Sequence, residues 1–386
     1  MTTLTAETIN SWADDTNGPV ALYLKQRLLP VEGEGAVIFP PTYADIGYNI
    51  DSLSDGTKVC TIDSVGSQAN RMEPIFKDAP NSQLVPQIEI ELHSTNGHVE
   101  KRSLLDLAHR AADAVVHSSP SLAPQIAKAF KALHQRHNAM PLCCVAPTSL
   151  VFGAWDSRGG SGEKLPRLIR SVIRAWDVDV LSGAAQFNSV WKFLMDEQKA
   201  ELEKEAKAKQ TKLSEKGFAD APATFRKVSS SAAKNMPEFK DGSPNPARRV
   251  LGGVSARGRI EREVTINLIA LRNLKGATDT ETCHIHRYLL ALTLIAAVSE
   301  ASLFLRSGCQ LQIADPEDNW SLVPRRGAPK CIIFPPDALG GILLTYALEA
   351  AKPFNELWPK ELSHKFDLRE AKRLLAKKED DASEED

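Results

Sequence analysis

The sequence predicts an α+β fold in which helices cover one side of an open sheet. Short stretches of alternating apolar residues are separated by longer stretches with helical apolar spacing, and the order strand, helix, strand recurs near both ends of the chain. The length of 386 residues, 42% of them hydrophobic, provides for a sizeable core. This composition excludes a disordered polymer, a collagen-like repeat and a small disulfide scaffold.

The first half of the chain begins its pattern at Lys58–Asp63, whose alternation predicts a strand. Ser64 follows this strand and is suited to cap a helix that runs toward Phe76. Arg167–Trp176 alternates again and predicts a strand buried on one side, although the same residues also fit a helix. Between them we expect a strand over 84–92, helices over 104–116 and 122–133, and an extended segment over 147–155.

The second half opens with a charged segment, 196–216, that predicts a solvated helix, and a Pro/Ser-rich segment, 217–246, that predicts a long flexible insertion. Val254–Leu271 predicts a strand that places Val264, Ile266, Leu268 and Ala270 on one face. We then expect a helix over 283–305, strands over 310–313 and 331–334, and a helix over 337–349. Together with the unit at 58–77 these elements predict a βαββαβ layout.

The domain organisation that follows is a single core with insertions. The core spans residues 1–350, the charged and Pro/Ser-rich insertion spans 196–250, and a C-terminal extension with an acidic tail spans 351–386.

Residues 288–305 are apolar enough to raise the question of a membrane span, but Thr293 and Glu300 favour a helix buried against the sheet. The amino terminus lacks a secretory signal and no cysteine pair has C-x-x-C spacing, so we expect reduced thiols in the cytoplasm.

Charge is unevenly distributed along the chain. The formal net charge is −2, but the last eight residues hold six acids and no base, so the remainder of the chain carries a net positive charge. Two internal stretches, Arg158–Arg174 and Arg248–Arg262, are rich in arginine. The planar guanidinium suits phosphate contacts and stacking on bases, whereas the alternative interpretation is a solvated face with scattered ion pairs.

Two motifs suggest chemistry that their details do not support. Gly159–Leu165 resembles a phosphate-binding loop, but Glu163 separates the last glycine from Lys164, and Leu165 replaces the hydroxyl that would hold Mg²⁺. His134 and His137 could share a helix face but have no third ligand nearby, and Cys283, His284 and His286 at a helix start are more simply capping and core groups. We therefore expect no nucleotide cofactor and no metal.

The polar run that follows the first predicted strand is the strongest candidate site. Its small residues allow backbone to approach a ligand, and Ser67, Gln68, Asn70 and Arg71 offer donors suited to phosphates, sugar hydroxyls and unpaired bases. A helix cap with polar decoration is the alternative. If this run and both arginine-rich stretches bear on one sheet, they form an arginine-lined groove for a single nucleic-acid strand.

Four segments resemble a known family: Asp63–Pro74 (DSVGSQANRMEP), Phe152–Ser157 (FGAWDS), Pro166–Ser171 (PRLIRS) and Gly252–Gly258 (GGVSARG). In order and spacing, over roughly residues 55–350, they are similar to the RAMP-superfamily backbone subunit of type I-U (I-G) CRISPR surveillance complexes. The resemblance implies a modified RNA-recognition-motif core with inserted finger-like and thumb-like elements.

The same resemblance implies a non-catalytic protein without a cofactor. It would bind the guide segment of CRISPR RNA, stack head to tail with copies of itself and with other complex subunits, and present the guide to invading DNA. The residues implied to contact RNA or line its channel are Ser67, Gln68, Asn70, Arg71, Arg158, Arg167, Arg170, Arg174, Arg257, Arg259 and Arg262. Met72 or Trp155 is a possible stacking residue, although core packing also explains both. The alternative is an RNA-cleaving RAMP endoribonuclease that uses Asp63 or Asp156.

Overall fold

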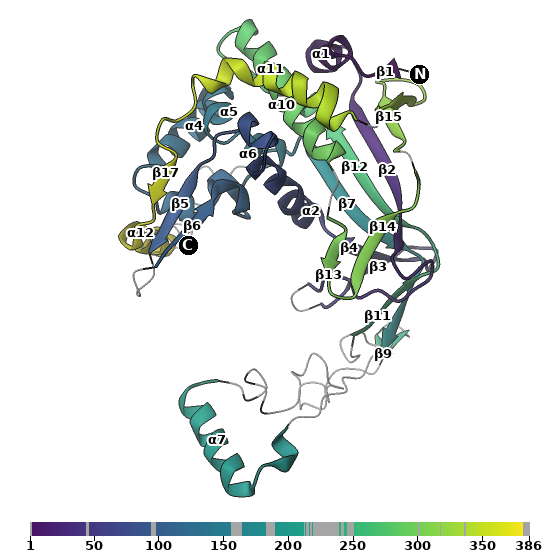
Figure 1. Ribbon diagram of the computed structural model, residues 1–386, viewed down its shortest axis with the longest axis vertical. Coiled ribbons are helices and arrows are strands. Elements are labelled where there is room, and N and C mark those ends of the chain that lie inside the picture. The colour runs from purple at the N-terminus through teal and green to yellow at the C-terminus, as the bar shows by residue number, and fades with distance from the viewer. Residues whose placement is uncertain are drawn as a thin grey trace.

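A computed structural model gives the arrangement of the chain. It describes residues 2–43, 46–93, 98–155, 164–182, 190–211, 251–299, 302–316, 318–335 and 337–380, together with 213, 216, 218, 239–240 and 243–244. The fold is α+β, as predicted. A mainly antiparallel sheet is covered on one side by helices, among them α2 (Val65–Met72), α10 (Asp279–Val298) and α11 (Leu344–Asn355) (Figure 1).

The centre of the main sheet is four antiparallel strands in the order β15-β2-β12-β7. Along the chain they come as β2 (Ala21–Pro30), β7 (Ile169–Trp176), β12 (Ile260–Asn267) and β15 (Trp320–Val323). Helices lie between β2 and β7 and between β12 and β15, which is the βαββαβ layout of an RNA-recognition motif. The layout was predicted, but its first strand is β2 and not residues 58–63.

Further strands extend this sheet at both edges. β4 (Lys58–Asp63) pairs with β7 and carries β3 (Asn49–Ser52) at its outer side. At the opposite edge β16 (Lys330–Ile333) pairs with β15 and with the short β1 (Thr2–Thr3). β14 (Cys309–Ile313) pairs with the second half of β2 and with β13 (Phe304–Arg306).

The main core lies between the sheet and the helices. Its centre is α10 (Asp279–Val298), which is capped by Thr278 and packs against α1 (Ala6–Asp14) and α11 (Leu344–Asn355). Tyr288 of α10 stacks on Phe354 of α11 with ring centroids 4.3 Å apart, and its hydroxyl donates to the Leu84 carbonyl. In the part of the chain that the structure describes, no helix is long and apolar enough to cross a membrane.

Other helices of the described chain are α2 (Val65–Met72), α3 (Ala114–His117), α4 (Ala123–Arg136), α5 (Met140–Val145), α6 (Thr148–Val151) and α9 (Leu268–Asn273). A small sheet of β6 (Val99–Ser103), β5 (Glu89–His93) and β17 (Ser363–Lys365) lies away from the main sheet (Figure 1). The C-terminal helix α12 (Leu368–Asp380) packs against α3.

A second core supports a hairpin beyond the end of the main sheet. β8 (Val178–Ser182) pairs with β11 (Leu251–Ala256), and the hairpin packs on a separate apolar cluster that includes Ile38 and Val254. Residues 183–250 are inserted between these two strands, and most of the predicted flexible insertion lies outside the described residues. Within the insertion, α7 (Asp196–Ala208) buries no residue, which confirms the predicted solvated helix.

Several predicted elements differ from the structure. The segment expected to be extended, 147–155, contains the helix α6, because Leu150, Val151 and Phe152 are all buried and show no period. Leu268 and Ala270 belong to the helix α9, not to the strand that holds Val264. The helix predicted over 104–116 is instead two 3₁₀ turns followed by the short helix α3. Of the strand predicted over 84–92 only the last four residues are extended, in β5 (Glu89–His93). The helix predicted over 283–305 spans 279–298, and 337–349 contains a π-helical turn (Leu339–Leu343) followed by α11.

Candidate nucleic-acid interface

The polar run after β4 forms the helix α2, which packs on β7. Ser64 is its N-cap, as predicted, and the Ser64 hydroxyl accepts a hydrogen bond from the backbone N–H of Ser67 at 3.3 Å. Gln68 and Met72 face the sheet, whereas Asn70 is exposed and Ser67 is half-buried. Only one side of this helix is therefore available to a ligand.

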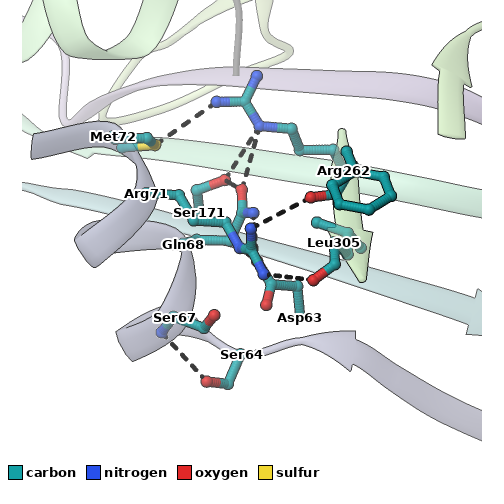
Figure 2. A network of polar contacts seen from close by, with 10 residues as sticks. Asp63, Ser64, Ser67, Gln68, Arg71, Met72, Ser171, Arg262 and Leu305 are labelled. Carbon is teal, nitrogen blue, oxygen red and sulfur yellow. Dashed lines mark hydrogen bonds and ion pairs between the residues drawn. The ribbon is translucent and has the colours of Figure 1, made fainter. Parts of the chain in front are cut away.

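The buried side of α2 carries a network of polar contacts (Figure 2). Gln68 is fully buried, and its amide nitrogen donates to Asp63 Oδ2 at 2.6 Å. Its carbonyl oxygen accepts from Ser171 Oγ at 2.7 Å and from Arg262 Nε at 3.3 Å. The network therefore joins α2 to β4, β7 and β12.

Arg262 is the cationic centre of this network and is only 3% exposed. Burial lowers the pKa of its guanidinium to about 10, so it stays charged at neutral pH. Among the described residues no carboxylate contacts Arg262 directly. Asp63 reaches it through Gln68, and Asp318 reaches it through Gln26, which accepts from Arg262 Nη1 at 2.9 Å and donates to Asp318 at 2.6 Å. Gln68 and Arg262 were predicted to contact RNA, but the structure places both side chains inside the protein, where they hold α2 on the sheet.

Arg71 points from α2 toward β13. Its Nε lies 3.1 Å from Asp63 Oδ2, and its Nη2 donates to the Leu305 carbonyl at 2.9 Å (Figure 2). The side chain is one quarter exposed, so a part of its guanidinium faces solvent. Asp63, the carboxylate considered for RNA cleavage, is 1% exposed and engaged by both Arg71 and Gln68, whereas Asp156 lies outside the described residues.

Arg110 joins the end of α2 to the loop that precedes β7, and sequence analysis did not find it. Its Nε lies 2.6 Å from Glu73 Oε2, its Nη2 donates to Asn70 at 3.2 Å, and its Nη1 donates to the Gly153 carbonyl at 3.1 Å. Burial raises the pKa of the Glu73 carboxyl to about 7, even though the charge of Arg110 acts in the opposite direction. No local pattern reveals this group, because its members lie on three separate segments.

The two arginines within β7 lie on the face of the sheet that is turned away from α2. Ser171 points toward α2, so Arg170 and Arg174, which alternate with it, lie on the opposite face. Arg174 donates to Glu263 Oε2 at 3.0 Å, whereas Arg170 is exposed. Arg167 is exposed just before the strand, and its Nε donates to the Phe152 carbonyl at 3.0 Å. Arg158 lies outside the described residues.

The third predicted cluster lies at the far end of β7. Arg257 pairs with Asp177 at 3.1 Å and with Asp179 at 3.3 Å, and Arg259 lies 4.0 Å from Glu261. β7 has 8 residues, and at about 3.3 Å per residue its ends lie on the order of 25 Å apart. All three clusters bear on the main sheet, but the structure does not bring them into a single groove.

A difference in pairing separates the two ends of β7. Lys164, Arg167 and Arg170 lie at its beginning, and within the described part of the chain none of them contacts a carboxylate. Arg174, Arg257 and Arg259 each have a carboxylate partner. We call Asn70, Trp155, Lys164 and Arg167 the β7 entry surface, whereas Arg170 lies on the opposite face of the sheet. Among the described residues, no carboxylate competes with an anionic ligand for its two cations.

The histidines considered as metal ligands have structural roles. His134 stacks on Phe130 with centroids 6.0 Å apart, His137 ends α4 in a left-handed conformation, and His286 Nε2 bonds the Leu274 carbonyl at 2.7 Å. Over the described ranges no group of three His, Cys, Asp or Glu side chains has the arrangement of a metal site.

Comparison with known families finds one match over part of the chain. Residues 22–180 match the family described as CRISPR-associated protein GSU0053 (Cas_GSU0053). The matched part is less than half of the chain, and it includes β2, α2 and the β7 entry surface. The match indicates similarity to a CRISPR-associated protein family. No curated protein matches the chain.

Proposed function

We propose that this chain is a non-catalytic backbone subunit of a type I-U (I-G) CRISPR surveillance complex. It binds the guide segment of CRISPR RNA in the cytoplasm, associates head to tail with copies of itself and with other complex subunits, and presents the guide for pairing with invading DNA. The observation that carries the proposal is the β7 entry surface, where two cations that contact no carboxylate among the described residues lie within the segment similar to CRISPR-associated proteins.

The non-catalytic part of the proposal is supported by the state of Asp63. This carboxylate is buried and engaged by Arg71 and Gln68, so it is not placed to activate a 2′-hydroxyl or to hold a metal with a free coordination position. We expect the assembled complex to leave bound target RNA intact. Cleavage that disappears in Asp63→Asn, with assembly unchanged, would establish the endoribonuclease instead.

The RNA-binding part is tested by the salt dependence of affinity. Neutralised phosphates release counterions, so the logarithm of the affinity for a single strand falls linearly with the logarithm of salt concentration, with a slope of about 0.7 per phosphate contact. The double variant Lys164→Gln/Arg167→Gln is expected to reduce this slope by about 1.4. Fluorescence anisotropy with a guide-length RNA at several salt concentrations measures it.

The matched control removes the same charge elsewhere. Lys352 on α11 and Arg373 on α12 are exposed cations on the helical side of the molecule, and Lys352→Gln/Arg373→Gln is expected to leave the slope unchanged. Equal slopes for wild type and both double variants would contradict RNA binding at the β7 entry surface.

Assembly is tested by co-expression with a CRISPR array. The proposal predicts large particles that contain repeat-spacer RNA and a mass that increases with the length of the guide, because a head-to-tail interface does not close on itself. Light scattering gives the mass, and sequencing identifies the co-purified RNA. A monomer free of nucleic acid, obtained in the presence of the array and the other subunits, would overturn the proposed function.

A further inference from the structure

We propose that Trp155 is a stacking platform for one unpaired base of single-stranded RNA, and that Lys164 beside it contacts the adjoining phosphate. The inference rests on the proposed function, and it assigns a particular contact within the β7 entry surface. Trp155 lies where the helical segment ends and the chain turns toward β7, next to cations that contact no carboxylate among the residues the structure describes.

The exposure of Trp155 is the first observation. Its side chain is 47% exposed, whereas the other tryptophans of the described chain are buried or half-buried. Leaving so much of an indole in water forgoes the hydrophobic gain that burial would give, which is on the order of 25 cal/mol for each Å² of apolar surface. A large exposed aromatic surface on an ordered segment is typical of a binding contact.

The backbone beneath the indole is fixed from several sides. Trp155 forms a β-bridge with Lys164, and the N–H of Leu165 donates to the Ala154 carbonyl at 2.8 Å. Gly153 has a φ of +80°, and a Cβ atom there would lie 2.7 Å from Arg167 Cγ, so only glycine permits this close packing. Trp155 is therefore held in place before any ligand binds, which lowers the entropic cost of binding.

Lys164 supplies the charge. Its Nζ lies 4.9 Å from the centroid of the Trp155 ring, and its side chain is exposed. A cation beside an aromatic platform is the combination that binds single-stranded nucleic acid without strong sequence preference, because every base has a face that stacks. A surface that binds another protein is expected to mix carboxylates of its own with its cations. Within the described residues, Lys164 and Arg167 contact no carboxylate, which favours RNA as the partner.

Continuity with α2 is the final observation. Arg110 bonds both the Asn70 side chain and the Gly153 carbonyl, so the exposed end of α2 and the segment that carries Trp155 form one connected unit. Ser67 and Asn70 lie three residues apart on the helix and therefore face the same side. An RNA strand whose phosphates follow this side of α2 reaches Trp155 where the helix ends.

Three substitutions in the full-length protein test the proposal. Trp155→Leu removes the aromatic face but keeps an apolar side chain, and it is expected to weaken binding of short single-stranded oligo(A) and oligo(U) RNA about tenfold. Trp155→Phe keeps a stacking face and is expected to stay within about threefold of wild type. Lys164→Met is expected to reduce the salt slope by about 0.7. Thermal unfolding checks that each variant is folded.

Ultraviolet cross-linking followed by peptide mass spectrometry provides an independent measurement, in which the cross-linked peptide is expected to include Trp155. If the wild type binds RNA and Trp155→Leu binds it equally tightly, the stacking site is wrong while the proposed function stands. If that variant instead loses association between subunits, the indole contacts protein and the inference is overturned. If the wild type binds no RNA, the proposed function itself fails.

Discussion

Arg262 shows how a single residue determines the position of α2. Its buried guanidinium donates to Gln26 and Gln68, and two carboxylates are attached through these amides. Removing the cation takes the Arg262 donor from the buried amide oxygen of Gln26 and one of two donors from that of Gln68, which is costly because an unpaired buried group loses its hydration without compensation. Arg262→Met is therefore expected to lower the free energy of unfolding by about 3 kcal/mol, measured by urea denaturation.

The control is Arg259→Met on the turn that precedes β12. Arg259 is 73% exposed and reaches Glu261 only at 4.0 Å, so its loss is expected to change the free energy of unfolding by no more than about 0.5 kcal/mol. Similar stabilities for the two variants would mean that the buried network contributes nothing and that Arg262 is replaceable by an apolar side chain.

At the scale of the elements, α10 makes stability depend on pH. His286 of α10 is 5% exposed, and burial lowers the pKa of its imidazole below the usual value of 6.5. The unfolded chain therefore takes up a proton at a higher pH than the folded protein does. The stability that this group contributes is complete above pH 6.5 and is lost as the pH falls through the pKa of the folded state.

We therefore expect the free energy of unfolding to fall from pH 7.5 to pH 5.5 less steeply in His286→Gln than in the wild type. Urea denaturation at several pH values measures the difference. His98→Gln replaces an exposed histidine and is expected to keep the slope of the wild type. An unchanged slope in His286→Gln would show that acid sensitivity has another origin.

Which elements are predictable depends on where their partners lie. β7 and α4 were predicted because their apolar residues repeat with the period of a strand or a helix. β2 was missed, although Leu22, Leu24 and Leu28 alternate, since the inward Gln26 interrupts the pattern. Gln26 is inward because it bonds Arg262, which lies 236 residues away, and such a contact leaves no local signal.

The same distinction applies to the candidate site. The Ser64 cap and the exposed Asn70 follow from local rules, and the structure agrees with the cap. The burial of Gln68 and Arg262 does not follow, because their contact joins residues 194 positions apart. Composition alone treats all arginines alike, whereas the structure separates Arg174, Arg257 and Arg259, which are paired with carboxylates, from those that contact no carboxylate among the described residues.

At the scale of the whole molecule, neither hydrophobic core depends on the inserted helix α7. The main core and the second core contain no residue of α7, and the hairpin β8–β11 leaves and rejoins the fold at paired positions, Ser182 and Leu251. Replacing residues 183–250 with a two-residue Asn-Gly turn is compatible with an antiparallel hairpin. Because the replacement also shortens a loop, it does not raise the entropic cost of closing the hairpin.

The deletion is therefore expected to change the free energy of unfolding by no more than about 1 kcal/mol, measured by urea denaturation of the purified protein. Ile38→Ala serves as the control, since Ile38 is buried in the second core and bridges Val254, and its truncation is expected to cost about 3 kcal/mol. A deletion as damaging as Ile38→Ala would mean that the insertion packs on the fold. If the deleted protein is stable, the insertion is not needed for folding and can serve assembly or guide binding. The RNA affinity of the deleted protein then tests guide binding, and its particle mass tests assembly.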